Sequence, residues 1–332
     1  MSELVPERLT IAVLTYRREQ DIAEALPLLL AQAEDVSHDP DLGVIAQVLV
    51  VDNDPLASAR EAVGEFASHR LRYVCEPLPG IANARNRALA EAADARFLVF
   101  IDDDERPHEH WLARLLKTRA EAGAAVVAGA VESEFDAPLP PWIAAGDFFR
   151  RRRLPTGTAI HVAATNNLLL DLDVVRAAGL DFDVDFGLSG GEDTLFTRTL
   201  AARGERMVWC NEALVTDRVP VERLTRHWVL ARAFSSGNSV TRVALRLAEG
   251  PRQRWQARLR GLGLGLPRTV AGIAQAGLGY ALRSPRHQAR GLRTAARGAG
   301  MVMGSVGHVY QEYRREDGSP RETGHGKRTT AA

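Results

Sequence analysis

The stretch RFLVFIDDDE, residues 96–105, decides the fold that this sequence predicts. Its apolar run, residues 97–101, has the length and composition of a strand that is buried on both faces, and three aspartates end it. The apolar runs at residues 9–15 and 47–51 have the same build, because polar residues follow each of them at once. The three polar segments are Thr15-Tyr16-Arg17, Asp52-Asn53-Asp54 and Asp102-Asp103-Asp104.

Helical patterns separate these apolar runs. Apolar residues recur at intervals of three and four along residues 17–32, and residues 57–67 and 82–93 are also predicted to be helices. Further strands are predicted at residues 71–75, 124–131, 161–170 and 206–210, and a further helix at residues 193–203. Strands that alternate with helices predict an α/β fold with a mostly parallel sheet. Such sheets bind ligands at the carboxyl ends of their strands, where the polar segments of this chain fall.

The three consecutive aspartates predict a metal site. Like charges a few Å apart raise each other's pKa, and a divalent cation relieves this repulsion. Carboxylate oxygens suit Mg²⁺ or Mn²⁺, which commonly join one or two carboxylates to a diphosphate. In an extended chain end, Asp102 and Asp104 lie on one face and Asp103 on the other. The alternative is that Asp103 and Asp104 begin a following helix whose first turn holds Pro107.

Five motifs stand in a characteristic order: LTIAVLTYRRE, VLVVDND, PGIANARNRAL, FIDDDE and SGGEDTLF. In this order and at these spacings the sequence resembles the family 2 glycosyltransferases with the GT-A fold, over about residues 8–240. The resemblance implies a Rossmann-like sheet flanked by helices and an enzyme of the nucleotide-diphospho-sugar transferase superfamily. It also implies a nucleotide-diphospho-sugar donor and Mg²⁺ or Mn²⁺ as cofactor.

The resemblance also implies a donor site. Asp104 would be the most direct metal ligand, Asp102 would contact the ribose or the water shell of the metal, and Asp103 leaves the register ambiguous between them. The other donor-binding residues implied are Thr15, Tyr16, Arg17, Asp52 (with Asn53 or Asp54 sharing its role), Gly80, Arg85 and Asn86. Arg85 would pair with a diphosphate oxygen or with the aspartates. The alternative for Arg85 is an ordinary arginine on a helix surface.

The acceptor side is implied by the Gly-Gly-Glu-Asp segment at residues 190–193. Inverting transfer needs a base that removes the proton of the acceptor hydroxyl, and a carboxylate positioned by a loop can do this. The resemblance makes Asp193 the candidate base, with Glu192 positioning the acceptor or sharing the role. The alternative is that Asp193 only caps the following helix.

The segment RLTRHW, residues 223–228, matches only loosely the basic-aromatic segment that closes over the diphosphate in many relatives. Its arginine does not directly precede the tryptophan as in processive polysaccharide synthases, so we expect addition of a single sugar. The acceptor would be a glycan or a lipid-linked glycan. Two alternatives are a nucleotidyltransferase of similar fold and a non-catalytic protein that binds sugar nucleotides at a membrane surface. The first normally has a glycine-rich loop after strand one, and TYRREQDI contains no glycine.

The charge of the chain is unevenly distributed. The 332 residues hold 42 basic and 42 acidic side chains, but residues 1–220 carry a net charge of −14 and residues 221–332 a net charge of +14. With 45% hydrophobic and 25% charged residues, the composition excludes a fibrous chain and a chain that is disordered throughout. We predict a glycosyltransferase domain at residues 1–225, a helical Arg-rich extension at residues 226–315 and a disordered tail at residues 316–332.

The Arg-rich extension predicts amphipathic helices. Five arginines recur at intervals of three and four, which places them along one helical face: Arg283, Arg286, Arg290, Arg293 and Arg297. Helices of this kind suit an anionic membrane surface, where the protein would lie beside a lipid-linked acceptor. The alternative is that their apolar faces pack on the acidic domain. Nucleic-acid binding is not expected, because this part lacks an aromatic stacking platform.

The compartment is predicted from three absences in the sequence. The first nine residues lack the apolar core of a secretory signal, and Cys75 and Cys210 lack metal-type spacing, as expected of reduced thiols. The longest late apolar stretch without charge, residues 269–282, is shorter than the ~20 residues that a spanning helix needs. We therefore expect a cytoplasmic protein, peripheral on the inner face of the plasma membrane, that works in cell envelope polysaccharide biosynthesis.

Overall fold

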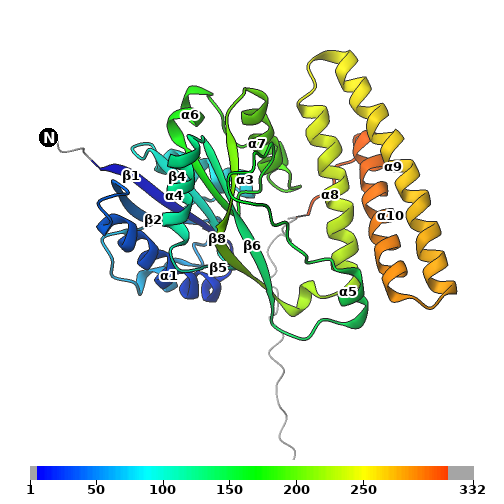
Figure 1. The fold of residues 1–332 in the computed structure, drawn as a ribbon, viewed down its shortest axis with the longest axis horizontal. Helices are drawn as coiled ribbons and strands as arrows, with labels where there is room; N and C mark the ends of the chain where they lie inside the picture. Colours follow the sequence, from blue (N-terminus) through cyan, green and yellow to red (C-terminus); the bar gives the residue numbers. More distant parts are fainter. Residues whose placement is uncertain (1–5, 313–332) are drawn as a thin grey trace, which may run out of the picture.

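In the computed structural model, which describes residues 6–312, eight strands form one sheet in the order β3-β2-β1-β4-β7-β6-β8-β5 (Figure 1). The strands are β1 (Glu7–Thr15), β2 (Val44–Asp52), β3 (Leu71–Cys75), β4 (Phe97–Asp102), β5 (Glu105–Pro107), β6 (Val126–Phe135), β7 (Asn167–Asp171) and β8 (Met207–Val219). β1 to β4 are parallel to one another, β7 is antiparallel to both of its neighbours, and β6 and β8 are parallel. The predicted α/β fold is confirmed.

The register of the first strands brings the polar segments together. Thr15 pairs with Asp52 across β1 and β2, and Leu14 pairs with Asp102 across β1 and β4. Because these strands are parallel, their carboxyl ends meet at the same edge of the sheet. The polar segments that follow the strands are therefore neighbours in space.

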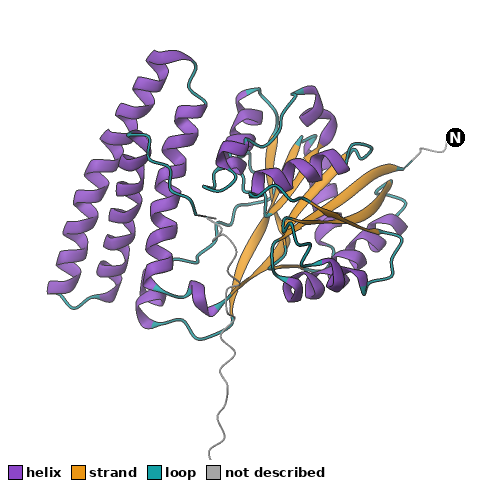
Figure 2. Cartoon of the chain, turned by 180° about the vertical axis from the view of Figure 1, so that it is seen from behind, coloured by secondary structure: helices purple, strands orange, loops and turns teal. Residues whose placement is uncertain are grey.

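Helices cover both faces of the sheet (Figure 2). They are α1 (Glu19–His38), α2 (Arg60–Gly64), α3 (Ile81–Glu91), α4 (Trp111–Ala122), α5 (Pro141–Gly146), α6 (Leu172–Ala177) and α7 (Glu192–Ala202), with short 3₁₀ turns at Val184–Phe186 and Val221–Arg223. On one face α1 and α4 bury Leu26 and Trp111 against the odd-numbered residues of β1. On the other face α3 and α7 pack around Phe100, Phe182 and Phe196.

Several predicted elements differ from the structure. Of the helix expected at residues 57–67, only α2, Arg60–Gly64, is helical. The strand expected at residues 161–170 is β7, only Asn167–Asp171, because residues 161–166 form a loop. The alternative in which Asp103 and Asp104 begin a helix is wrong, because residues 105–107 form β5, which pairs with β8, and α4 begins only at Trp111. β8 continues to Val219, and residues 105–107 pair with its edge.

Three long helices form a layer beside the sheet: α8 (Arg226–Arg246), α9 (Gly250–Ala281) and α10 (Pro285–Ser305) (Figures 1 and 2). α10 packs against both α8 and α9, and α5 packs against the beginnings of α8 and α10 through Trp142, Val229 and Ala289. Pro285 lies in the first turn of α10, where its missing amide hydrogen is not needed. The predicted tail, residues 316–332, lies outside the described residues.

α8 runs without interruption through Gly237-Asn238 to Arg246. Gly237 allows close approach to α10, because a Cβ there would lie 2.0 Å from the Arg297 carbonyl oxygen. The side chain of Asn238 donates to the His308 carbonyl at 2.9 Å and accepts from the Tyr310 amide at 3.2 Å. Within residues 6–312, no helix combines the length and the apolar character needed to cross a bilayer.

Candidate active site

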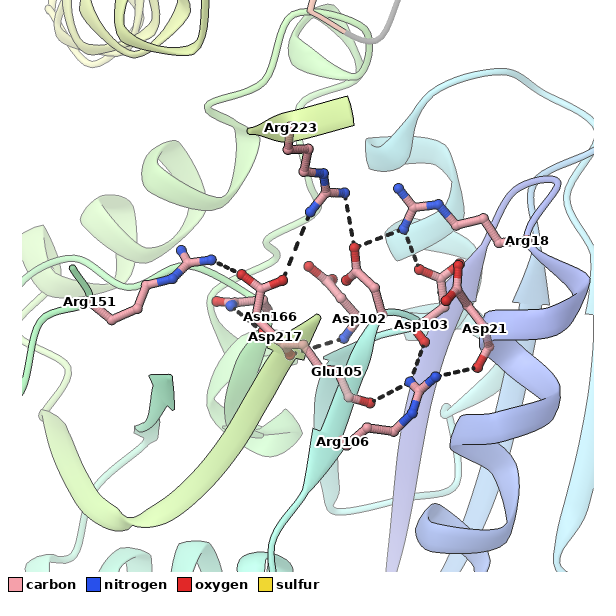
Figure 3. A network of polar contacts seen from close by, with 11 residues as sticks. Arg18, Asp21, Asp102, Asp103, Glu105, Arg106, Arg151, Asn166, Asp217 and Arg223 are labelled. Carbon is pink, nitrogen blue, oxygen red and sulfur yellow. Dashed lines mark hydrogen bonds and ion pairs between the residues drawn. The ribbon is translucent and has the colours of Figure 1, made fainter. Parts of the chain in front are cut away.

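The acidic segment after β4 lies at the centre of a polar network between the sheet and the first residues of the helical layer (Figure 3). Asp102 ends β4, Asp103 and Asp104 form a turn, and Glu105 begins β5. Figure 3 shows Arg18, just before α1, and Arg223, in the turn before α8, approaching Asp103 and Asp104, while Arg151 from the loop after α5 pairs with Asp217 on β8. The sheet therefore supplies the acids, and segments distant in sequence supply the cations.

Two arginines hold Asp103 and Asp104. Arg18 Nη1 lies 2.8 Å from Asp103 Oδ1 and 3.0 Å from Asp104 Oδ2, and Arg223 Nη2 lies 3.0 Å from the same Asp104 oxygen. Burial raises the pKa of Asp103 to about 7, and Arg18 opposes this rise more strongly than Asp104 adds to it. Asp104 thus stands between two guanidinium groups that would both be attracted to a diphosphate.

Asp102 differs from its two neighbours. Among residues 6–312 no hydrogen bond or ion pair reaches its carboxylate, which is half-buried. Desolvation by the surrounding protein raises its pKa, Asp104 raises it further, and Arg85, Arg18 and Arg223 lower it. An acid that has lost water without gaining a partner is where a bound cation would be most stabilising.

Glu105, the last residue of the FIDDDE motif, belongs to the same network. Its carboxylate accepts from Asn166 Nδ2 at 2.6 Å, and burial together with Asp102 and Asp104 raises its pKa well above the usual value. Asp217 on β8 pairs with Arg151 and lies 3.9 Å from Arg223. No local motif marks Asn166 or Asp217, because long-range strand pairing brings them here. Sequence signals did exist for Arg18, which directly follows the predicted segment, for Glu105 in the FIDDDE motif and for Arg223 in RLTRHW.

The polar segment after β2 turns inward. Asp52 is fully buried and accepts hydrogen bonds from the Ala59 amide at 2.9 Å and from the Tyr73 hydroxyl at 2.7 Å. Asn53 donates to the carbonyls of Glu76 and Leu78 and accepts from the Gly80 amide at 3.1 Å. These side chains hold the loops together, and their contact with a donor stays a prediction.

The segment after β1 lies beside this loop. Thr15 is buried, and its carbonyl accepts from the Asn53 amide at 2.9 Å. Arg17 has a φ of 54°, places its guanidinium 5.1 Å from the centre of the Tyr16 ring, and bonds through Nε to Asp54 Oδ2 at 3.2 Å. The structure thus brings the first two predicted donor segments together.

Gly80 and Asn86 connect α3 to the loop before α7. Gly80 has a φ of 115°, and a Cβ there would lie 3.2 Å from the Gly187 carbonyl carbon, so this position requires glycine. The side-chain amide of Asn86 donates to the Phe182 carbonyl at 2.9 Å and accepts from the Phe182 amide at 2.8 Å. Both residues fix the backbone around the site.

Arg85 and Glu192 form a buried ion pair between α3 and the first turn of α7. Arg85 is 5% exposed, so the alternative of an ordinary surface arginine is wrong. Burial raises the pKa of Glu192 to about 7, Arg85 lowers it, and Asp193 raises it. Asp193 is half-buried and accepts from the Thr194 amide at 2.5 Å. Gly191, not Asp193, is the N-cap of α7.

The donor set suits a hard divalent cation, because it consists of carboxylate oxygens, one of them without a partner. Within the described part of the chain, no three His, Cys, Asp or Glu side chains are grouped as a metal-binding set. The protein would therefore supply one or two ligands, Asp102 and Asp104, and a bound diphosphate would supply others.

Comparison with known proteins identifies the family. Residues 10–177, half of the chain, match the sequence model of glycosyl transferase family 2. The chain is a family 2 glycosyltransferase. It is 35% identical over 264 residues to the succinoglycan biosynthesis protein ExoM of Rhizobium meliloti (strain 1021), an alignment that covers 79% of this chain and 83% of that protein. It is 26% identical over 171 residues to the glycosyltransferase AglE of Haloferax volcanii, which covers 51% of this chain and 55% of that protein.

Solved structures support the GT-A fold of this glycosyltransferase. The mannosyltransferase PcManGT from Pyrobaculum calidifontis, in complex with GDP-Man and Mn²⁺, superposes with a TM-score of 0.58 at 19% identity, covering 90% of this chain and 87% of that one. GalNAc-T7 with UDP, GalNAc and Mn²⁺ gives a TM-score of 0.51 at 10% identity, covering 74% and 48%. Family membership decides for the glycosyltransferase over the nucleotidyltransferase and the non-catalytic protein.

Proposed function

We propose that this glycosyltransferase is inverting and metal-dependent, and that it moves one sugar from a nucleotide-diphosphate donor to a hydroxyl of a glycan or a lipid-linked glycan. The observation that carries the proposal is that two carboxylates at the end of β4 differ in their partners. Asp102 has no partner within the described chain, while Asp104 is shared between Arg18 and Arg223. A divalent cation on these carboxylates, with a diphosphate on the two arginines, would give each of these charged groups a partner of opposite sign.

In the proposed complex, Asp104 and Asp102 hold Mg²⁺ or Mn²⁺, and Arg18 and Arg223 bind the diphosphate. The metal supplies Lewis-acid stabilisation of the negative charge that grows on the diphosphate. The two solved structures of the same fold contain Mn²⁺, which supports this choice of cofactor. Arg223 reaches the site from the turn before α8 and so completes the diphosphate pocket from the side opposite α1.

Asp193 is the proposed base. It takes the proton of the acceptor hydroxyl while the oxygen attacks the anomeric carbon, and the nucleoside diphosphate leaves with the electron pair of the broken bond. A single displacement of this kind inverts the anomeric centre. Glu192 is committed to Arg85 in the interior, whereas Asp193 is partly exposed on the same turn. Glu192 and Arg85 are proposed to position that turn next to Asp102, whose pKa Arg85 lowers.

The proposed acceptor follows the relatives. The name of the 35% identical relative refers to the biosynthesis of a polysaccharide, which supports a glycan-type acceptor. We place the reaction in the cytoplasm, on the inner face of the plasma membrane.

Donor binding tests the metal site. Isothermal calorimetry with UDP, GDP and dTDP should detect binding of at least one nucleotide with Mn²⁺, and EDTA should abolish it. We expect Asp104→Asn to weaken metal-dependent binding by at least tenfold, whereas Asp181→Asn, an exposed acid in the loop before α7, should leave it unchanged. Binding that is equally strong with EDTA would disprove the metal site.

Turnover tests the base. We expect Asp193→Asn to lower kcat by about 10² to 10⁴, the usual contribution of a positioned base, and to leave nucleotide affinity within twofold. The same Asp181→Asn variant is the matched control. If Asp193→Asn keeps normal kcat with any donor and acceptor that the wild type uses, another group is the base.

A further inference from the structure

The outer helix α9 has small residues on its inner side and large apolar residues outside. Its buried residues are Gly261, Gly265, Gly272, Ala276 and Gly279. Its large apolar side chains, with Leu262 as the partly buried exception, are exposed: Trp255, Leu259, Leu264, Leu266, Val270, Ile273, Leu278 and Tyr280. A helix that belongs to a water-soluble layer normally buries such side chains. α9 therefore has apolar surface that the described chain does not cover.

Six of these side chains fall in one stripe. At 100° per residue, Trp255, Leu259, Leu266, Val270, Ile273 and Tyr280 lie within a sector of about 80° along α9. Their exposed fractions range from 49% for Leu259 to 66% for Val270. α9 forms the edge of the molecule farthest from the sheet (Figures 1 and 2), so neither the sheet nor its helices can cover this stripe.

The charges around the stripe are of one sign. Residues 250–311 contain ten arginines and no acidic residue. Within residues 6–312 none of these ten forms an ion pair. Desolvation lowers the pKa of Arg297, and the neighbouring cations Arg293 and Arg268 lower it further. α9 and α10 are thus positively charged without an ion pair to the rest of the described protein, whereas Arg232 and Arg246 of α8 are paired with acids.

We propose that α9 lies flat on an anionic lipid bilayer, with its apolar stripe in the boundary between headgroups and acyl chains and its arginines on lipid phosphates. Large apolar side chains beside unpaired cations are the signature of a helix that binds in the plane of such a surface. A second copy of the chain is the weaker occupant, because two layers with ten unpaired arginines each would repel one another.

α9 does not pack its large apolar side chains on the acidic domain, as the alternative for the extension requires. Its inner face meets α10 through glycines, with a Cβ on Gly272 only 2.4 Å from the Ala295 amide nitrogen.

α8 begins three residues after Arg223, so the proposed lipid contact is joined to the donor site through one helix. The stripe itself lies outside the donor site, and its test is therefore independent of sugar transfer.

Vesicle flotation tests the apolar part of the surface. The full chain should float with vesicles of phosphatidylcholine containing 30% phosphatidylglycerol and much less with phosphatidylcholine alone. A triple variant, Leu259→Ser, Val270→Ser and Ile273→Ser, should bind at least tenfold more weakly. The matched control replaces three exposed apolar residues of the catalytic part, Ile45→Ser, Leu56→Ser and Val184→Ser, and should bind like the wild type.

A charge variant tests the arginines without touching the stripe. Arg252→Ser with Arg258→Ser should weaken binding to the anionic vesicles roughly thirtyfold, since each cation near such a surface contributes ~1 kcal/mol. Arg198→Ser with Arg206→Ser, two exposed arginines near the sheet, is the control and should have no effect. Equal binding to neutral and anionic vesicles, or wild-type binding by either test variant, would overturn the proposal. So would a dimer in analytical ultracentrifugation that the triple variant dissociates, because it would assign the stripe to a second copy.

Discussion

Neighbouring acidic residues in this enzyme have different roles because their hydrogen-bond and ion-pair partners differ. Asp52 directs its oxygens to a backbone amide and to Tyr73, and Asp104 directs one oxygen to two arginines. Asp102 ends β4, which is separated from β2 and Asp52 by β1. Its carboxylate has neither kind of partner in the described chain. The resemblance places all three carboxylates in the donor site, but Asp52 is held by its internal hydrogen bonds, whereas Asp104 could exchange its arginines for a ligand and Asp102 could take one directly.

Glu192 carries a pH dependence of stability whose sign is fixed by its raised pKa. In the folded protein it binds a proton below about pH 7, and in the unfolded chain only below roughly pH 4.3. Between these values the native state holds a proton that the unfolded state lacks, so this group stabilises the fold as the pH falls from 7 towards 4.3. We expect the free energy of unfolding of the wild type to rise relative to Glu192→Gln over this range.

Urea titrations at several pH values measure this difference. The variant also leaves Arg85 without its partner, but that loss is constant over the range because an arginine stays charged. Parallel pH curves for the two proteins would show that Glu192 is ionised in the interior.

At the scale of elements, glycines determine how closely the three long helices approach. A Cβ on Gly300 would lie 2.0 Å from the Phe234 carbonyl oxygen on α8, and one on Gly291 would lie 2.4 Å from the Ala276 amide nitrogen on α9. α10 is therefore in backbone contact with both of its neighbours. The layer is held by close approach of main chains more than by interlocking large side chains.

Two alanine substitutions in α9 should have opposite effects. Gly272→Ala forces the helices apart and should lower the free energy of unfolding by about 1–3 kcal/mol. Gly277→Ala, five residues further on the same helix, meets nothing within 4 Å and should raise it by roughly 0.5–1 kcal/mol through better helix propensity. Urea unfolding followed by circular dichroism measures both. Equal effects of the two variants would contradict the backbone packing.

The local pattern predicts those strands whose own apolar run marks them without reference to their neighbours in the sheet. The strand runs ending at Thr15, Asp52 and Asp102 were predictable because five or more apolar residues precede each polar end. β5 was not, since three residues with Pro107 among them become a strand only where β8 offers an edge. For the same reason Asp217 and Asn166 could not be assigned to the acidic site, while the motifs that resemble the family led directly to Asp104 and Arg85.

At the scale of the whole molecule, α5 connects the donor site to the helical layer. Arg226 lies 4.9 Å from the Trp142 ring, and Trp228 stacks on Phe149 at 5.8 Å between ring centres. Arg223, which holds Asp104, stands directly before this contact. Changes at the diphosphate pocket should therefore reach α5 and the start of α8, while α9 touches neither segment closely.

Hydrogen exchange tests this connection. Binding of a nucleotide diphosphate with Mn²⁺ should slow amide exchange severalfold in α5 and in the first two turns of α8, and should leave α9 unchanged. Mass spectrometry of peptides from these helices gives the comparison within one sample. Protection spread evenly over all three helices of the layer would mean that the layer responds as one rigid unit.

The length of α9 has a consequence for how the enzyme would search. Thirty-two residues form a rod about 48 Å long. A rod that rests on a plane gives up one translation and two rotations, which leaves sliding in two dimensions and a spin about the membrane normal. The donor site would then travel at a constant height above the lipid, and an acceptor of fixed length anchored in the same plane would meet it at every encounter.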